Sequence, residues 1–322
     1  MAALSDAPLP EILELPNLGV ADLDPLLDEE IKVWEQRFSW NFRPSAELLR
    51  RFLHMHSLSG YALRWNRQVI GYAYHVCEGR KGLIGDFYVR VEHARSSNET
   101  MLLGAVVQGL MLTPGIRRIE SQLMLLQGRL QQAAPFSRYL TRHDRYFMDV
   151  DRESVLKLPA RSTNIRATFL WWAERFQEET ARLVVAAYKG HVDSEINDQY
   201  RSVPGARHFL TNIVRFPGCG QFAPGASIVA KDEHSGRICG VCLASLVSPK
   251  SGHVTQLCVL PGLRGGSLGY ELLRRCLVRL TELGCESISL TVTCSNRDAI
   301  RLYEAAGFRT HASFPALVWE GF

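Results

Sequence analysis

A chain of 322 residues is too long for one ordinary domain and fits two domains of about 150 residues each. Its hydrophobic content of 46% and charged content of 22% are typical of a globular protein and argue against disorder and fibrous repeats. The net charge of +4 is spread along the chain without a cationic block, so the sequence does not predict nucleic-acid binding, although a phosphate-bearing ligand fits this mild positive bias.

The first thirty residues are acidic and contain four prolines, and the first basic residue is Lys32. This composition predicts a loosely ordered leader. It lacks the basic start and apolar core of a signal peptide. No apolar run approaches the roughly 20 residues that cross a bilayer. We therefore expect a cytoplasmic protein with no membrane partner.

Five predicted elements occur in the same order in both halves of the chain, at an offset of roughly 165 to 170 residues, which is about one domain length. Each half has two strands joined by a turn, a third strand, a helix and a fourth strand. In the first half these elements are predicted at 61–65, 69–74, 86–89, 101–112 and 118–123. In the second half they are predicted at 227–230, 238–242, 255–259, 269–283 and 287–293. This order indicates a duplicated domain.

A domain boundary is predicted near Leu158, which divides the chain into residues 1–158 and 159–322. Beyond it, the apolar spacing from Ala167 to Tyr188 predicts a long helix. A polar, glycine-containing stretch follows at 190–224. In sequence order, this stretch stands where a substrate-binding helix and loop could precede the sheet, so its carboxylates are candidates for substrate binding. It could equally be an ordinary helix pair whose charges are solvated.

Two cysteines, Cys239 and Cys242, form a C-x-x-C pair inside an apolar run that reads as a strand. Alternation on a strand sends residues three apart to opposite faces, and no second pair completes a zinc site. We expect reduced, structural cysteines and no metal.

The glycine-rich stretch 262–269 follows a strand that Pro261 ends, and it precedes an amphipathic helix that Gly284 ends. Small residues let a ligand approach the backbone, and free N–H groups at a helix start point at phosphate oxygens. The stretch lacks the Lys-Ser/Thr pair of the nucleotide P-loop and the glycine spacing of the dinucleotide fingerprint. It therefore predicts an anion site of another kind.

These segments resemble two motifs of the GCN5-related N-acetyltransferase (GNAT) family. The first motif, Q/R-x-x-G-x-G/A after a strand ending near V-x-P, aligns with Arg264 at its start and Gly269 at its end, with Ser267 in place of the middle glycine. Further along, Ser295 and Asp298 predict the N-terminal box of a helix. The second family motif, N-x-x-A-x-x-L-Y-x-x-x-G-F, is matched at every position by Asn296, Ala299, Leu302, Tyr303, Gly307 and Phe308.

The resemblance implies an α/β (α+β) fold of two tandem GNAT-like domains, each with a mixed, mostly antiparallel twisted sheet, a splayed parallel strand pair and flanking helices. It implies direct transfer of acetyl from acetyl-CoA to an amine. Tyr303 would protonate the departing thiolate, since a tyrosine carries its proton at neutral pH. Asn296 would contact the cofactor by its side-chain amide. The pantetheine arm would be bound by backbone groups of Leu257, Cys258 and Val259, and the pyrophosphate by Arg264, Gly265, Gly266, Ser267, Leu268 and Gly269.

The acceptor side is less clearly marked in the sequence. Asp193 and Glu195 are candidates for binding the amine and taking its proton, with His253 behind them, and each is also compatible with a structural or solvated role. Cys258 could be read as a nucleophile, but direct transfer needs none, and its place on a strand predicts packing.

The first copy lacks the features that would bind acetyl-CoA. Its loop at 90–99 contains no glycine and carries Glu92 and Glu99, which would repel pyrophosphate. We therefore predict a degenerate N-terminal domain and a catalytic C-terminal one. The acceptor would be a small-molecule or peptide amine. A non-catalytic acyl-CoA-binding or sensor module is the alternative, and a third reading is a protein-modifying enzyme whose first domain grips a peptide.

Overall fold

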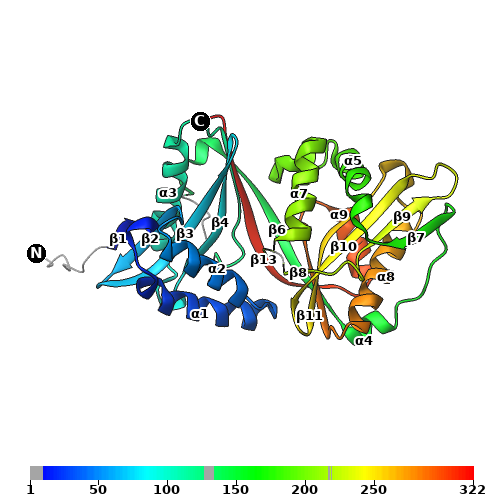
Figure 1. Cartoon of the computed structure of the whole chain (residues 1–322), viewed down its shortest axis with the longest axis horizontal. Coiled ribbons are helices and arrows are strands. Elements are labelled where there is room, and N and C mark those ends of the chain that lie inside the picture. The colour runs from blue at the N-terminus through cyan, green and yellow to red at the C-terminus, as the bar shows by residue number, and fades with distance from the viewer. Residues whose placement is uncertain (1–9, 127–133, 217, 219) are drawn as a thin grey trace, which may run out of the picture. The chain divides into compact units, whose positions relative to one another are not determined.

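The computed structural model describes residues 10–126, 134–216, 218 and 220–322 (Figure 1). The chain forms two compact units that are not continuous in sequence. Unit 1 consists of Met1–Phe38, Phe42–His143 and Phe314–Phe322, and unit 2 consists of Ser39–Asn41 and Asp144–Ser313.

Unit 1 contains a sheet with the strand order β1-β2-β3-β4-β5-β13. Its neighbouring strands are antiparallel except for β4 and β5, which are parallel. Helix α3 packs on the sheet through an apolar stripe that includes Leu103, Val106 and Leu110. The elements are β1 (Glu11–Glu14), α1 (Val20–Phe38), α2 (Arg43–His54), β2 (Gly60–Trp65), β3 (Gln68–Glu78), β4 (Lys81–Val89), α3 (Ser96–Leu112), β5 (Arg118–Gln122) and the end of β13 (Arg309–Glu320).

Unit 2 contains a sheet with the order β6-β12-β11-β10-β9-β7, and the short strand β8 pairs with β10. Helices α8 and α9 share one apolar core with the sheet, and α5 and α7 share another. The elements are β6 (Leu140–Asp151), α4 (Arg152–Leu156), β7 (Ala167–Trp171), α5 (Gln177–Tyr188), α6 (Asp193–Ile196), α7 (Val203–Arg215), β8 (Gln221–Phe222), β9 (Ile228–Asp232), β10 (Ile238–Ser248), β11 (Ser251–Val259), α8 (Leu268–Glu282), β12 (Ser287–Thr293), α9 (Arg297–Ala305) and the start of β13.

Each unit contains one parallel strand pair that separates along its length. In unit 1 the pairing of β4 with β5 stops at Ile84, although β4 continues to Val89. In unit 2 the pairing of β11 with β12 stops at Val254, although β11 continues to Val259. The predicted fold class, with mixed sheets, splayed parallel pairs and flanking helices, is confirmed.

The prediction of a loosely ordered leader is wrong for the part of it that the structure describes. Residues from 20 onward form α1, whose Leu23, Leu26 and Leu27 are buried, and Pro25 lies inside this helix. Burial of this apolar face outweighs the poor helix propensity of the acidic, proline-containing segment. Residues 1–9 lie outside the described part.

The predicted long helix over 167–188 is also wrong, because only its second part is helical. Residues 167–171 form β7, an edge strand that pairs antiparallel with β9 from Trp171–Ile228 to Ala167–Asp232. Helix α5 begins at Gln177. Thr, Phe and Trp favour a strand where a neighbouring strand is available, and that neighbour lies about 60 residues away in sequence.

The C-x-x-C cysteines are free and buried, as expected for structural thiols. Burial raises the pKa of Cys239 to about 11 and that of Cys242 well above its usual value. The expectation that they face opposite sides is wrong, since both belong to one apolar core. A register shift between Ile238 and Gly240 interrupts the alternation. Among the residues placed in the structure, none of the helices combines the length and apolar character needed to cross a membrane.

Candidate active site

The candidate site begins where β11 and β12 separate. Beyond Val254, β11 remains paired with β10 on one side, through the partners Gly240 and Val259. Within the described residues, its other edge has no partner strand from Thr255 to Val259. Backbone groups on this edge are therefore free to hydrogen-bond a ligand. The edge carries the three residues that the resemblance assigned to the pantetheine arm, Leu257, Cys258 and Val259.

The glycine-rich turn, residues 262–269, joins this strand to the 15-residue helix α8. In the part of the chain that the structure describes, the amide N–H groups of residues 265 to 270 have no hydrogen-bond acceptor. Arg264 differs from them, because its amide donates to the carbonyl oxygen of Pro261 at 3.3 Å. Six consecutive unpaired donors at the start of a long helix make a strong site for an anion.

Two residues of this turn have positive φ angles, Gly265 at 80° and Ser267 at 64°. Glycine adopts this conformation freely because it has no Cβ, whereas serine does so with strain. Ser267 stands at the N-cap of α8 and makes no capping hydrogen bond with its side chain. The conformation explains why the family motif has glycine at this position, and the serine keeps the same backbone path.

The neighbouring glycines differ in the space around them. A Cβ on Gly266 would lie 1.9 Å from Oδ1 of Asn164, whose backbone N–H donates to the Gly266 carbonyl oxygen. A Cβ on Gly269 would make ordinary contacts of 3.6 Å with Leu302 and 3.7 Å with Val259. Substitution of Gly266 therefore disturbs the fold of the turn, while the position of Gly269 has room for alanine, as the G/A alternative in the motif requires.

Tyr303 lies on α9 and is 8% exposed. Its hydroxyl group has no hydrogen-bond partner among the described residues. Burial raises the pKa of Tyr303 well above its usual value, with further contributions from Cys242 and Asp193, while Arg145 lowers it. The phenol is therefore protonated across the physiological pH range, as a proton donor must be.

Asn296 is the N-cap of α9, and its Oδ1 accepts a hydrogen bond from the amide of Ala299 at 3.2 Å. The prediction of a box formed by Ser295 and Asp298 is wrong by one residue, because α9 begins at Arg297 and the residue before it is Asn296. The capping bond uses the side-chain oxygen of Asn296 and leaves its NH₂ group for another partner.

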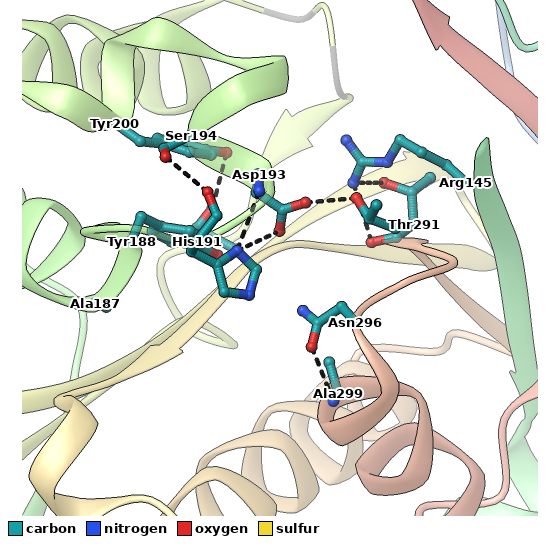
Figure 2. Close-up of polar contacts among 12 residues, drawn as sticks. Arg145, Ala187, Tyr188, His191, Asp193, Ser194, Tyr200, Thr291, Asn296 and Ala299 are labelled. Carbon is teal, nitrogen blue, oxygen red and sulfur yellow. Dashed lines mark hydrogen bonds and ion pairs between the residues drawn. The ribbon is translucent and has the colours of Figure 1, made fainter. Parts of the chain in front are cut away.

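Asp193, on the short helix α6, contacts the end of β12 (Figure 2). Its Oδ1 accepts a hydrogen bond of 2.5 Å from the hydroxyl of Thr293, and its side chain is 15% exposed. The ring of His191 lies beside it, with Nδ1 at 3.7 Å from Oδ2. That Nδ1 accepts the amide of Asp193 at 3.1 Å, so it cannot also carry a proton toward the carboxylate.

The segment that carries Asp193 is fixed to β11 by two tyrosines. Tyr188 and Tyr200 stack with ring centroids 4.5 Å apart. The side chain of Gln256 donates to the Tyr188 hydroxyl at 2.7 Å and accepts from Tyr200 at 3.4 Å. In addition, the guanidinium of Arg264 donates to the carbonyl oxygen of Ala187 at 2.7 Å. The strand edge, the glycine-rich turn and the Asp193 segment therefore form one connected framework.

The other candidates for acid–base or nucleophilic roles fit less well. Glu195 is exposed, whereas His253 and Cys258 are buried. Burial lowers the pKa of His253 to about 4, with a smaller contribution from Arg145, and its Nδ1 contacts the Ser289 hydroxyl at 2.9 Å. Burial raises the pKa of Cys258 to about 12, so it is a neutral thiol at physiological pH and a poor nucleophile.

Unit 1 has the same splayed strands but a different loop after them. The carboxylate of Glu29, on α1, accepts hydrogen bonds from the Tyr88 hydroxyl at 2.8 Å and from the Val91 amide at 3.1 Å, and it pairs with Arg90 at 2.8 Å. Backbone bonds within the loop use the amides of His93 and others. The loop of unit 1 is therefore filled by an internal carboxylate and its own hydrogen bonds.

Sequence reasoning missed four polar residues of the site: Arg145, Tyr188, Gln256 and Thr293. Tyr188 and Gln256 read as ordinary positions on a helix and a strand, and no local motif marks them. Arg145 lies before the predicted boundary, on β6, which pairs with β12. Among the described residues, no group of three or more His, Cys, Asp or Glu side chains could hold a metal ion.

Comparison with protein-family models matches residues 194–308 to the Acetyltransferase (GNAT) family. Among curated proteins, N-alpha-acetyltransferase MAK3 from Arabidopsis thaliana is 30% identical over 78 residues, which are 23% of this chain and 41% of that protein. The chain thus spans less than half of the length of this relative.

Two solved structures match almost the whole chain. A tandem GNAT protein from the clavulanic acid biosynthesis pathway has a TM-score of 0.62 and 15% identity, over 97% of this chain and 98% of that one. A GCN5-related N-acetyltransferase from Sphaerobacter thermophilus has a TM-score of 0.64 and 17% identity, over 97% of this chain and 95% of that one. At these identities the likeness is one of fold.

Proposed function

Because the chain belongs to the GNAT superfamily and has the fold of a tandem GNAT protein, we propose that unit 2 is an N-acetyltransferase that uses acetyl-CoA. One observation supports this most strongly. The six amides of residues 265 to 270, which have no acceptor within the described ranges, adjoin the edge of β11 that has no partner strand there. A phosphate-binding turn and an open strand edge are together what a ligand with a diphosphate and a long amide-bearing arm requires.

The residues of the turn fit a diphosphate in charge as well as in geometry. The segment 261–270 contains no acidic residue and one arginine, Arg264. Amides from Gly265 to Gly269 would hold the pyrophosphate, the edge from Leu257 to Val259 would hold the pantetheine arm, and the NH₂ group of Asn296 would add one donor. Acetyl-CoA would supply a thioester for direct attack by the amine.

Tyr303 and Asp193 would move the protons of the transfer. Asp193 would accept a proton from the acceptor's ammonium group, which leaves a nucleophilic amine. As the new C–N bond forms and the C–S bond breaks, Tyr303 would donate its proton to the sulfur, and the second proton of the attacking nitrogen would pass to the tyrosinate that this leaves, which restores the phenol. The hydroxyl of Tyr303 has no partner among the described residues and its pKa is raised by burial, and both features support this role.

Unit 1 is proposed to bind no acetyl-CoA. The Glu29 carboxylate takes the amide of Val91 and the guanidinium of Arg90, which are groups that an incoming diphosphate would need. A second negative charge close to Glu29 would be repelled. Residues 1–158 would then complete the fold, and residues 159–322 would carry the transferase chemistry.

The acceptor is proposed to be a small-molecule or peptide amine. The name of the plant relative, an N-alpha-acetyltransferase, points to an α-amino group. A non-catalytic acyl-CoA sensor is the second candidate. It is favoured by the strained Ser267 in the turn. A Tyr303 hydroxyl that has no partner in the described part of the chain favours catalysis.

Calorimetry with CoA tests the binding site. Gly262 and Gly225 both have open space around the position of a Cβ, so an aspartate at either position fits the fold. We expect Gly262→Asp, in the turn, to weaken CoA binding by about tenfold through charge repulsion, and Gly225→Asp to leave it unchanged. Failure of the intact chain to bind CoA, or equal affinities for the two variants, would refute the proposed site.

Release of free thiol from acetyl-CoA in the presence of amines separates the two candidate functions. An enzyme releases thiol at a rate that depends on the amine, and Tyr303→Phe slows it. A sensor binds CoA with the same affinity but releases no thiol above the rate of the solution without protein.

A further inference from the structure

Two opposite charges approach neighbouring threonines at the end of β12. Arg145 on β6 lies directly opposite Thr293 in the antiparallel ladder, so their side chains share one face of the sheet. Thr291, two residues earlier, also lies on that face. The Arg145 guanidinium donates to the Thr291 hydroxyl at 3.1 Å and to its carbonyl oxygen at 3.4 Å.

The carboxylate of Asp193 reaches the same face from α6, where it accepts the Thr293 hydroxyl at 2.5 Å. Figure 2 shows Asp193 and Arg145 approaching β12 from opposite sides, with Thr291 beside the guanidinium. Residues two apart on a strand are separated by about 6.6 Å. Thr293, which bonds the carboxylate, and Thr291, which bonds the guanidinium, are therefore about 6.6 Å apart along β12.

Both charges act on the proposed proton donor. Asp193 raises the pKa of Tyr303 and Arg145 lowers it, after the larger effect of burial. Their effects on one phenol place the carboxylate and the guanidinium within electrostatic reach of the group that would protonate the sulfur. An amine that attacks next to this sulfur would therefore meet a negative charge and a positive charge together.

We propose that the acceptor is a free α-amino acid, with its ammonium group bound by Asp193 and its carboxylate bound by Arg145. This inference rests on the proposed acetyltransferase function of unit 2. The amino group and the carboxylate of an α-amino acid lie on one carbon, so one small molecule can place a charge-assisted hydrogen bond of about 2.8 Å on each of two groups that are anchored two residues apart on a strand. A simple cationic amine would instead face the like charge of Arg145, which disfavours it.

The arrangement also distinguishes an amino acid from the N-terminus of a peptide. In a peptide the carboxylate next to the amino group is replaced by a neutral amide, which cannot make the same charge-assisted contact with a guanidinium. Arg145 therefore acts in this proposal as the residue that selects for a free carboxylate, and it comes from a strand of the N-terminal half.

The test compares several L-amino acids with their primary amides in the thiol-release assay. We expect kcat/KM for each acid to exceed that for its amide by on the order of 10- to 100-fold, the usual effect of a hydrogen bond to a charged group. The amino group of an amide loses its proton more easily, so a preference for the acid cannot come from amine reactivity. Arg145→Gln is expected to bring the acid-to-amide ratio close to one, and Arg145→Lys to restore part of it.

Arg152→Gln, at an exposed position on α4 of the same unit, is the matched control and should keep the ratio of the wild type. Equal use of acids and amides by the wild type, or an equal loss with both in Arg145→Gln, would overturn the inference and leave acetyl transfer intact. Absence of CoA binding would overturn the proposed function itself.

Discussion

Replacement of Ser267 by glycine tests whether the positive φ angle of Ser267 strains the backbone of the glycine-rich turn and lowers the stability of the fold. At a φ of 64°, a residue with a Cβ is disfavoured by roughly 1–2 kcal/mol. Glycine avoids this strain but loses about 0.5–1 kcal/mol through the greater freedom of the unfolded chain. The expected net gain in the free energy of unfolding is therefore about 0.5–1 kcal/mol, which corresponds to an increase in Tm of about 1–4 °C for a unit of this size.

Alanine and valine at position 267 complete the series. Ser267→Ala keeps the Cβ and loses no capping bond, because the serine side chain makes none, so it should behave like the wild type. Ser267→Val adds a branched Cβ, which is poorly tolerated at positive φ. Thermal unfolding and CoA calorimetry should both give the order glycine, then serine and alanine, then valine. Equal Tm values and CoA affinities for the glycine and valine variants would refute the strain argument.

Three further predictions concern proton transfer, pH and domain organisation. Tyr303→Phe should lower kcat by about 10²- to 10⁴-fold with CoA affinity retained, as measured by steady-state kinetics and calorimetry. Burial raises the pKa of Glu30 well above its usual value of 4.5, and the carboxyl group of Asp86 raises it further by electrostatic repulsion. The folded chain thus keeps a proton that the unfolded chain releases, so stability falls as pH rises above 4.5 and through the folded pKa. Glu30→Gln should flatten that dependence in thermal unfolding. A fragment of residues 159–322 should not fold alone by circular dichroism, because it lacks the β6 strand that pairs with β12 from Ser287 to Thr293.

Each of these predictions has a control in the same chain. Tyr270→Phe removes a buried hydroxyl that bonds the Pro159 carbonyl oxygen, so it should lower stability and spare kcat. Glu35→Gln, exposed on the same helix as Glu30, should leave the pH dependence of Tm unchanged. Co-expression of residues 1–158 should rescue the fragment. A fragment that unfolds cooperatively and binds CoA by itself would contradict the last prediction.

The duplicated fold could be predicted because its signals are local. Strand alternation, the turn between paired strands and the glycine after α8 lie within short windows of sequence. The wrong predictions concern segments whose secondary structure is decided by contacts with residues far away in the sequence. Residues 167–171 become a strand because β9 is beside them, and α1 forms because Leu23, Leu26 and Leu27 have a core to fill.

The candidate site divides in the same way. The glycine-rich turn and the Tyr303 motif are contiguous segments whose residues the sequence shows directly. The Asp193 side is assembled from α6, β11, β12 and β6, and its contacts join residues about 100 positions apart, such as Asp193 with Thr293. The sequence pointed to two carboxylates in this stretch, but only the fold separates the largely covered Asp193 from the exposed Glu195.

The exchange of strands between the halves gives the first copy a role that does not depend on acyl-CoA. Residues 144–151 of β6 pair with β12 in unit 2, and Ala316–Glu320 of β13 pair with β5 in unit 1. Each sheet is thus completed by a strand from the other half of the sequence. Removal of the first half of the sequence would take β6 from β12, and with it Arg145 from the face that carries Asp193 and Thr293. A first half without a phosphate-binding turn would therefore still be indispensable, because β12 of the second half pairs with its strand β6.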